Sequence, residues 1–295
     1  MITDAAWREL LHTRAFEPGA IASAYAARRR RPLLGPSGTL FLVAADHPAR
    51  GALGAAGDPT AMADRRSLLE RLLVALDNPA VDGVLGTPDI IEELLLLHGL
   101  HDKVVIGSMN RGGLAGADWE IDDRFTAYSA ESIVDYRLDG GKMLLRLVNS
   151  DAGTAPTLQA CAEAVSALAS AGVMAMVEPL PYERREGSLV LQSDATSLAR
   201  AVTVASGVGR TSAHTWLKLP APADPSAVLG ATTLPSLVLG GPEADKSLWE
   251  KTLRHPVVRG LVVGRTLLYP EDGDVAAAVA AAASLLRSTR EEISA

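Results

Sequence analysis

The chain alternates short apolar runs with longer amphipathic runs, and it completes this alternation eight times. The apolar runs that predict buried β-strands span residues 39–45, 81–85, 103–108, 142–148, 173–178, 215–219, 236–239 and 261–263. The amphipathic runs that predict helices span residues 58–76, 88–98, 130–136, 158–171, 194–206, a short stretch after Pro225, 246–255 and 275–287. Strands that alternate with helices form a parallel sheet, and eight of them close into a barrel. The sequence therefore predicts an α/β fold of the (β/α)8 TIM-barrel type.

The length of 295 residues fits one such barrel, because barrels of this type often reach that size as one domain. We expect a single domain over residues 1–295, in which residues 1–31 form an N-terminal helical extension that caps the bottom of the barrel. An open doubly wound sheet is the alternative fold. It would need a glycine fingerprint after the first strand, and residues 45–49 (ADHPA) lack one.

Charge and composition limit the partners. The net charge of −7 argues against nucleic-acid binding. The basic run Arg28–Arg31 is expected to be a solvated helix end. The single cysteine, Cys161, permits no disulfide within the chain. With no apolar segment long enough for a membrane span or a signal peptide, we expect a cytoplasmic protein with no membrane partner, and also a homo-oligomer.

The active site of such a barrel lies at the carboxyl ends of its strands. The polar and glycine residues at those ends are Asp46-His47, Asn110-Arg111, Lys142, Arg146, Glu178, Lys218, Gly240-Gly241 and Gly264-Arg265. Positions 142, 144 and 146 share one face of their strand because side chains alternate along it.

Lys218 is the most informative of these residues. It lies in an apolar strand, where a lysine is rarely tolerated without a partner or a function. Desolvation and nearby positive charge favour the free amine, which can attack a carbonyl carbon. A snorkelling lysine or a structural ion pair would explain the same residue.

Three further residues complete the predicted catalytic set. Glu178 can shuttle protons during imine chemistry, or it can form a salt bridge to Lys142 or Arg146. Lys142 can favour the free amine of Lys218 by charge repulsion, or it can be that salt-bridge partner. Asp46 can hydrogen-bond a substrate hydroxyl or orient a lysine, or it can cap the next segment.

The last two strand ends predict a phosphate site. Barrels often bind phosphate in the loops after strands seven and eight, where Gly240, Gly241 and Gly264 expose backbone N–H groups. Arg265 adds a guanidinium fork that matches phosphate. Together with Arg146, these residues form the predicted substrate-binding set.

We expect no metal and no cofactor. His47 and His214 could join Asp46 and Glu178 as ligands, but the sequence has no closely spaced histidine pair and no thiolate cluster.

Four segments resemble the class I aldolases of the fructose-bisphosphate and tagatose-bisphosphate type. They are MVEPLPY at 176–182, WLKLP at 216–220, GGKMLL at 140–145 and VVGR at 262–265. The resemblance runs in register from about residue 39 to residue 268. It implies that Lys218 forms the imine, Glu178 is the acid/base and Lys142 assists electrostatically, while Gly241, Gly264 and Arg265 hold phosphate.

The chain departs from these aldolases at two places. The lysine strand continues Leu-Pro where an acidic residue often follows, and the seventh strand ends LGGPE where tagatose-bisphosphate aldolases usually have a serine. The sugar specificity therefore stays open. The whole chain also resembles an aldolase-like barrel family associated with myo-inositol catabolism. That resemblance implies cleavage of 2-deoxy-5-keto-gluconate 6-phosphate to dihydroxyacetone phosphate and malonate semialdehyde.

These observations predict a metal-independent, lysine-dependent aldolase that acts on a phosphorylated keto sugar or keto sugar acid. Two alternatives stay open. A sugar-phosphate isomerase or epimerase would share the phosphate loops without needing Lys218 as a nucleophile. A non-catalytic barrel would only bind the sugar phosphate.

Overall fold

The computed structural model describes residues 1–241 and 246–294. Eight parallel strands close into a barrel in the order β4-β3-β2-β1-β9-β8-β7-β5, and β4 pairs with β5 to complete the ring. The parallel strands are β1 (Leu40–Ala44), β2 (Gly83–Gly86), β3 (Val104–Ser108), β4 (Gly140–Leu147), β5 (Met174–Arg185), β7 (Thr215–Leu219), β8 (Ser236–Leu239) and β9 (Val258–Val263). The predicted TIM barrel is confirmed.

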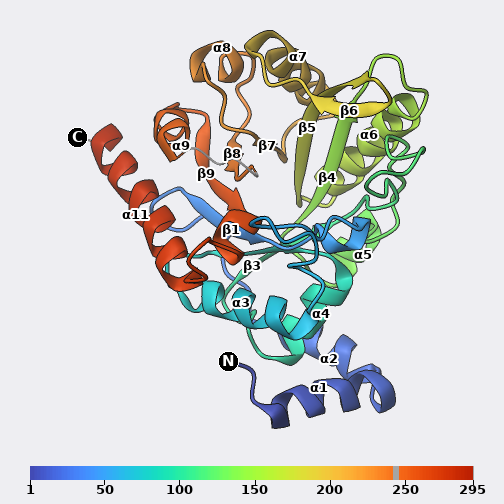
Figure 1. The fold of residues 1–295 in the computed structure, drawn as a ribbon, viewed down its shortest axis with the longest axis vertical. Coiled ribbons are helices and arrows are strands. Elements are labelled where there is room, and N and C mark those ends of the chain that lie inside the picture. The colour runs from blue at the N-terminus through green and yellow to red at the C-terminus, as the bar shows by residue number, and fades with distance from the viewer. Residues whose placement is uncertain (242–245, 295) are drawn as a thin grey trace.

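Helices surround the barrel on its outer side (Figure 1). They are α1 (Asp4–Phe16), α2 (Gly19–Ala27), the 3-10 helix η1 (Pro48–Arg50), α3 (Arg65–Asp77), α4 (Pro88–Leu96), α5 (Ala130–Asp135), α6 (Thr154–Ser170), α7 (Ala195–Ser206), α8 (Pro225–Leu229), α9 (Lys246–Leu253), α10 (Arg265–Leu268) and α11 (Val275–Ser294). None of the helices in the described part of the chain is long and apolar enough to span a bilayer.

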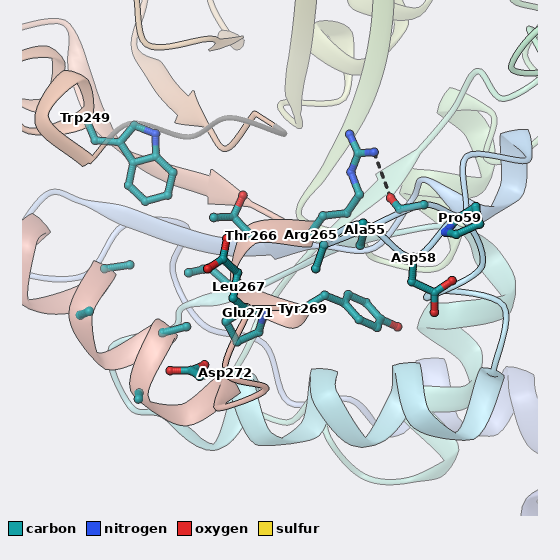
Figure 2. Close-up of a pocket in the computed structure, with 18 residues that line it drawn as sticks. Ala55, Asp58, Pro59, Trp249, Arg265, Thr266, Leu267, Tyr269, Glu271 and Asp272 are labelled. Carbon is teal, nitrogen blue, oxygen red and sulfur yellow. Dashed lines mark hydrogen bonds between the residues drawn. The ribbon is translucent and has the colours of Figure 1, made fainter.

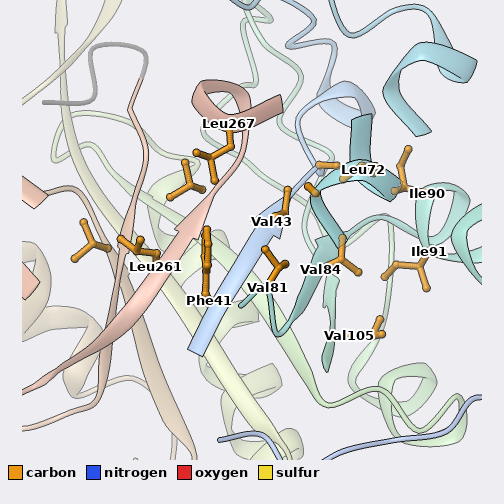
Figure 3. Close-up of a cluster of buried hydrophobic side chains, with 14 of the residues drawn as sticks. Phe41, Val43, Leu72, Val81, Val84, Ile90, Ile91, Val105, Leu261 and Leu267 are labelled. Carbon is orange, nitrogen blue, oxygen red and sulfur yellow. The ribbon is translucent and has the colours of Figure 1, made fainter. Parts of the chain in front are cut away.

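Successive side chains of each strand point alternately outward and into the barrel, so the core has two parts. The outward side chains Phe41 and Val43 of β1 pack against the surrounding helices, where Leu72 and Ile90 lie (Figure 3). The inward cluster fills the barrel with Leu40, Leu42, Ala44, Leu85, Val104, Ile106, Met174, Met176, Trp216, Leu237 and Val262. Because side chains two residues apart share a face, residues that follow the inward set at the strand ends point into the mouth.

The N-terminal extension differs from the prediction. Residues 1–31 contain two helices, α1 and α2, which are separated at Pro18. The bottom of the barrel is covered by the segment that follows them, because Leu33 and Leu34 pack against the inward cluster. The arginine run follows the end of α2, and Arg29 and Arg30 are exposed as expected, but the run is not solvated throughout. Arg28 is buried and pairs with Asp139 at 3.1 Å, so the expectation was wrong for this residue.

Two other elements were misjudged. Helix α3 begins at Arg65 rather than at residue 58, because the Asp64 side chain accepts a hydrogen bond from the backbone N–H of Ser67 and caps the helix there. Strand β5 continues past residue 178 and forms an antiparallel hairpin with β6 (Ser188–Leu191). The predicted end of this strand missed the hairpin, which reaches over one side of the mouth.

Candidate active site

A cavity of about 190 Å³ lies at the carboxyl ends of the strands. All nine predicted site residues line it: Asp46, Lys142, Arg146, Glu178, Lys218, Gly240, Gly241, Gly264 and Arg265. Cavities for drug-sized ligands span about 300–1,000 Å³, so this one suits a small metabolite. The structure brings the predicted residues together, and their chemical roles remain predictions.

Glu178 joins the two lysines of the site. Its Oε2 lies 2.5 Å from Nζ of Lys142, and its Oε1 lies 3.0 Å from Nζ of Lys218. The strand register explains this arrangement, because Met176 pairs with Lys142 on β4 and with Trp216 on β7, and Glu178 and Lys218 each lie two residues further on. The lysine side chains are only 2% and 5% exposed. Two salt bridges, Glu178–Lys142 and Glu178–Lys218, therefore lie at the mouth of the barrel. They correspond to the structural alternatives that the sequence leaves open for these residues.

Asp46 extends this network on the other side of Lys142. Its Oδ2 lies 3.2 Å from Nζ of Lys142 and 3.2 Å from Nη1 of Arg111. It also accepts a hydrogen bond of 2.9 Å from Oγ of Ser108. In this buried network, basic and acidic side chains alternate in the order Arg111, Asp46, Lys142, Glu178 and Lys218. The network holds two carboxylates and three basic side chains, which means that one basic group lacks a carboxylate of its own.

The electrostatics follow from burial and from this alternation. Burial raises the pKa of Glu178, but Lys142 and Lys218 outweigh burial and lower that pKa to about 2. For Asp46, Arg111 and Lys142 likewise outweigh burial, so its pKa lies well below its ordinary value. Burial lowers the pKa of Lys142 to about 8, although Asp46 and Glu178 raise it. Both carboxylates are therefore anions at neutral pH, whereas Lys142 can lose its proton at mildly alkaline pH.

Arg111 and His47 also belong to the cavity, although their positions at strand ends gave them no predicted role. Arg111 donates from Nε to the backbone carbonyl of Asn110 at 2.6 Å, and its buried Nη2 has no partner among the described residues. Nδ1 of His47 is also buried and has no hydrogen-bond partner among the described residues, although it lies 3.9 Å from Oδ1 of Asp46. Burial lowers the pKa of His47 to about 3, so this imidazole stays neutral at physiological pH.

The predicted phosphate residues lie at the ends of β8 and β9. A Cβ atom on Gly264 would lie 2.5 Å from the backbone oxygen of Ala44, and one on Gly240 would lie 2.6 Å from Cγ1 of Val263. Close packing therefore requires glycine at both positions. Arg265 donates from Nη1 to the backbone carbonyl of Gly54 at 3.2 Å (Figure 2). No carboxylate in the described part of the chain forms a salt bridge with Arg265.

Arg146 lies at the cavity wall, but its guanidinium group is engaged by a loop. It pairs with Glu120 at 2.5 Å and with Asp123 at 3.3 Å. Tyr182 and Arg50, which the sequence reasoning missed, also line the cavity. Tyr182 lies on the part of β5 beyond the predicted strand end, so a longer predicted strand would have found it.

A second and larger hollow, of about 1180 Å³, lies beside the first. The loop of residues 54–59, α10 and α11 line it, together with Trp249 (Figure 2). It shares Arg265 and Thr266 with the smaller cavity but contains neither lysine. We assign the chemistry to the smaller cavity because the ionisable network lies there. Within the described residues, no group of three or more His, Cys, Asp or Glu side chains is placed to hold a metal ion.

The closed barrel carries two buried lysines at its mouth, and solved TIM-barrel structures share its fold. The likeness in fold is to two solved aldolases. An archaeal fructose 1,6-bisphosphate aldolase shares 18% identity at a TM-score of 0.64, covering 91% of this chain and 99% of that one. The fructose-bisphosphate aldolase from Slackia heliotrinireducens shares 15% identity at a TM-score of 0.59, covering 97% and 92%.

The particular family is shown by sequence. Residues 38–283 match the Cgl0159-like family model, and the chain belongs to that family. The crystal structure of Cgl0159 from Corynebacterium glutamicum (Brevibacterium flavum) shares 50% identity at a TM-score of 0.95, covering 98% of this chain and 99% of that one. No curated protein matches the chain.

Proposed function

We propose that this protein is a class I aldolase that cleaves a phosphorylated keto sugar or keto sugar acid through an imine on Lys218. The observation that carries the proposal is the placement of Glu178 between two buried lysines, 2.5 Å from Lys142 and 3.0 Å from Lys218. Imine chemistry needs a nucleophilic amine with a proton acceptor in hydrogen-bond contact. The network supplies both groups at the mouth of the barrel, where barrel enzymes bind their substrates.

The ion pairs of the network favour Lys218 over Lys142 as the nucleophile. Two carboxylates balance two of its three basic groups, and a buried charge without a partner is costly. Lys218 sits at one end of the alternation and contacts a single carboxylate, whereas Lys142 contacts both. Lys218 therefore has fewer ion pairs to break than Lys142 when its nitrogen forms a covalent bond.

In the proposed reaction, Nζ of Lys218 attacks the ketone carbon of the substrate and forms a carbinolamine. Glu178 takes up a proton from Nζ of Lys218 as the carbinolamine forms, and it then transfers that proton to the departing hydroxyl. Water leaves and the protonated imine remains. Glu178, again a carboxylate, removes the proton from the hydroxyl on the distal carbon. The carbon–carbon bond breaks, its electron pair moves into the imine to give an enamine, and the distal fragment leaves as an aldehyde. Protonation of the enamine and attack by water then release the second product and restore the amine.

Glu178 can change its role during this sequence because its surroundings change. In the free enzyme two lysines together lower its pKa to about 2 despite burial. The carbinolamine nitrogen is uncharged, so the positive charge of Lys218 no longer lowers the pKa of Glu178, while burial still raises it. The pKa of the carboxyl group then rises, and the group can hold and deliver a proton. Asp46, which Lys142 and Arg111 hold in place, is the proposed partner of a substrate hydroxyl.

The proposed site for the substrate phosphate is the end of the cavity formed by Arg265, Gly240, Gly241 and Gly264. Among keto sugar acids we propose to test 2-deoxy-5-keto-gluconate 6-phosphate first, with dihydroxyacetone phosphate and malonate semialdehyde as the expected products. The proposed form of the enzyme is a cytoplasmic homo-oligomer that needs no metal.

The test is a panel of phosphorylated keto sugars and keto sugar acids incubated with the enzyme before and after exhaustive EDTA treatment. We expect one of them to be cleaved into two carbon fragments at an unchanged rate after chelation. Interconversion of isomers without fragments would favour the isomerase alternative. Binding without any reaction would favour a sugar-phosphate-binding barrel, and activity restored by a divalent ion would place the enzyme among metal-dependent aldolases.

A further inference from the structure

Arg50 is a cationic side chain of the cavity that has no role in the proposed reaction. It is the last residue of η1, the 3-10 helix after β1, and Gly51 follows it in the left-handed conformation with φ 77°. The Arg50 side chain is 20% exposed and lines the same cavity as Lys218 and Arg265. The loop after the first strand therefore places a second arginine near the predicted phosphate end.

Arg50 is held in place without being fully neutralised. Its Nη1 lies 3.1 Å from Oε1 of Glu120, and its backbone carbonyl accepts a 2.8 Å hydrogen bond from the N–H of Ala115. The same Oε1 of Glu120 also accepts from Arg146 at 2.5 Å, so one carboxylate serves two guanidinium groups. The Nε and Nη2 groups of Arg50 form no hydrogen bond with any described residue. These donors are thus pre-positioned and free to bind a ligand.

Arg265 is tied to the same loop. Its Nη1 donates to the carbonyl of Gly54, four residues after Arg50 (Figure 2). After burial, the charge of Arg50 is the strongest influence that lowers the pKa of Arg265. Two like charges that line one small cavity repel each other. No carboxylate of the described chain forms a salt bridge with Arg265, and the charges of Asp46 and Glu178 offset the repulsion only from a longer distance. An anion with two negative charges would relieve this repulsion.

We propose that Arg50 and Arg265 together form a two-arginine site for the phosphate group of the substrate, with Arg50 supplied by the loop after β1. A phosphate monoester near neutral pH carries close to two charges and has three acceptor oxygens, enough for both guanidinium groups and the backbone of the glycines. The inference deepens the proposed function, since it rests on the phosphate end assigned there. It makes Arg50 a specificity-determining residue for phosphorylated over neutral substrates.

The test is calorimetric titration with glycerol 3-phosphate, which has no carbonyl group and cannot form an imine. We expect Arg50→Met to weaken binding roughly 10- to 100-fold, the range for loss of one charge-assisted contact, and Arg50→Lys to give an intermediate loss. Arg184→Met is the matched control, because Arg184 pairs with Asp151 at 2.7 Å and does not line the cavity. It should bind glycerol 3-phosphate as the unaltered protein does.

Affinities of Arg50→Met and Arg50→Lys within about twofold of the unaltered protein would overturn the proposal. So would the absence of any binding of glycerol 3-phosphate to the unaltered protein. Circular dichroism and thermal melting verify that each variant is folded, and the Lys variant decides the question if the Met variant is not. Because the probe does not react, this result is independent of imine formation. A failed aldolase mechanism and a failed phosphate site can therefore be told apart.

Discussion

The floor and the rim of the cavity are built in different ways. The floor carries Asp46 just after β1, Lys142 and Glu178 within β4 and β5, and Lys218 near the end of β7. Each is buried and paired with its neighbour. The rim carries Arg50 and Arg265 on short helices and Tyr182 on the hairpin, and these side chains are more exposed. In the proposed reaction, the strands fix the relative positions of the groups that exchange protons, and the loops supply the groups that recognise the substrate.

This difference shows why the two parts should respond differently to mutation. Removal of a floor residue breaks a buried alternation of charges and should stop the chemistry. Removal of a rim residue should weaken the binding of one part of the substrate and leave bond breaking intact. The predictions that follow probe this division, beginning with the largest expected effect.

The largest effect is expected at Lys218. Lys218→Met removes the proposed nucleophile and should lower kcat by roughly 10⁴- to 10⁶-fold, the scale found when a covalent nucleophile is deleted. Steady-state kinetics on the active substrate gives the measurement. Lys251→Met, at an exposed position of α9, is the control and should keep full activity. A Lys218→Met enzyme within tenfold of the control would show that the floor works without this amine.

The next effect is expected at Glu178. Glu178→Gln keeps the shape of the side chain but can no longer shuttle protons, so kcat should fall by roughly 10²- to 10⁴-fold. Glu183→Gln, on the outer part of the hairpin, changes the same group away from the floor and should have little effect. If KM rose and kcat did not change, Glu178 would be a binding residue and the division between floor and rim would fail.

Lys142 should give the reaction a pH dependence. Its pKa is about 8, lowered by burial and only partly restored by Asp46 and Glu178. Above that pH it loses its charge, and Glu178 loses one of the two cations that position it, so kcat/KM should fall by up to about tenfold per pH unit. Lys142→Arg keeps the charge at all these pH values and should remove this alkaline limb. If kcat/KM of Lys142→Arg fell at alkaline pH as it does in the unaltered enzyme, the fall would come from another group.

The smallest effect concerns stability in acid. Burial lowers the pKa of His47 from 6.5 to about 3, so between these values the unfolded chain binds a proton that the folded chain does not. Stability is therefore lost as the pH falls through this window, by at most about 1.4 kcal/mol per pH unit. His47→Gln should reduce the loss of unfolding free energy between pH 6 and pH 4, measured by urea denaturation. The exposed His12→Gln is the control, and equal slopes in both variants would contradict the burial argument.

The fold and the floor could be predicted because local signals determine them. Lys218 and Glu178 interrupt apolar strands, and the strand register of a parallel barrel then requires that they meet. The predicted start of α3, at residue 58, was wrong because Asp58, Pro59 and Asp64 are all residues that commonly precede or begin a helix. The structure uses Asp64 as the N-cap. Strand β5 continues beyond its apolar residues. The hydrophobic pattern therefore does not indicate where this strand ends.

The rim and the bottom of the barrel depend on contacts between residues far apart in the sequence. The Arg50 side chain is held by a hydrogen bond to Glu120, 70 residues away. Arg28 can be buried because Asp139, 111 residues away, neutralises its charge. Nothing near Arg28 distinguishes it from a solvated arginine. A charge run is usually a solvated face, and only the tertiary pairing made that expectation wrong.

The most direct test of the account is reductive trapping. Sodium borohydride added with dihydroxyacetone phosphate should inactivate the enzyme and leave a stable adduct on the peptide that contains Lys218, located by tandem mass spectrometry. Lys218→Met should form no adduct even though Lys142 remains, and Lys142→Met should still form its adduct on Lys218. An adduct on Lys218 in the unaltered enzyme is the result that the account predicts. If the active substrates and dihydroxyacetone phosphate leave no adduct, or leave it on Lys142, the proposed mechanism is wrong.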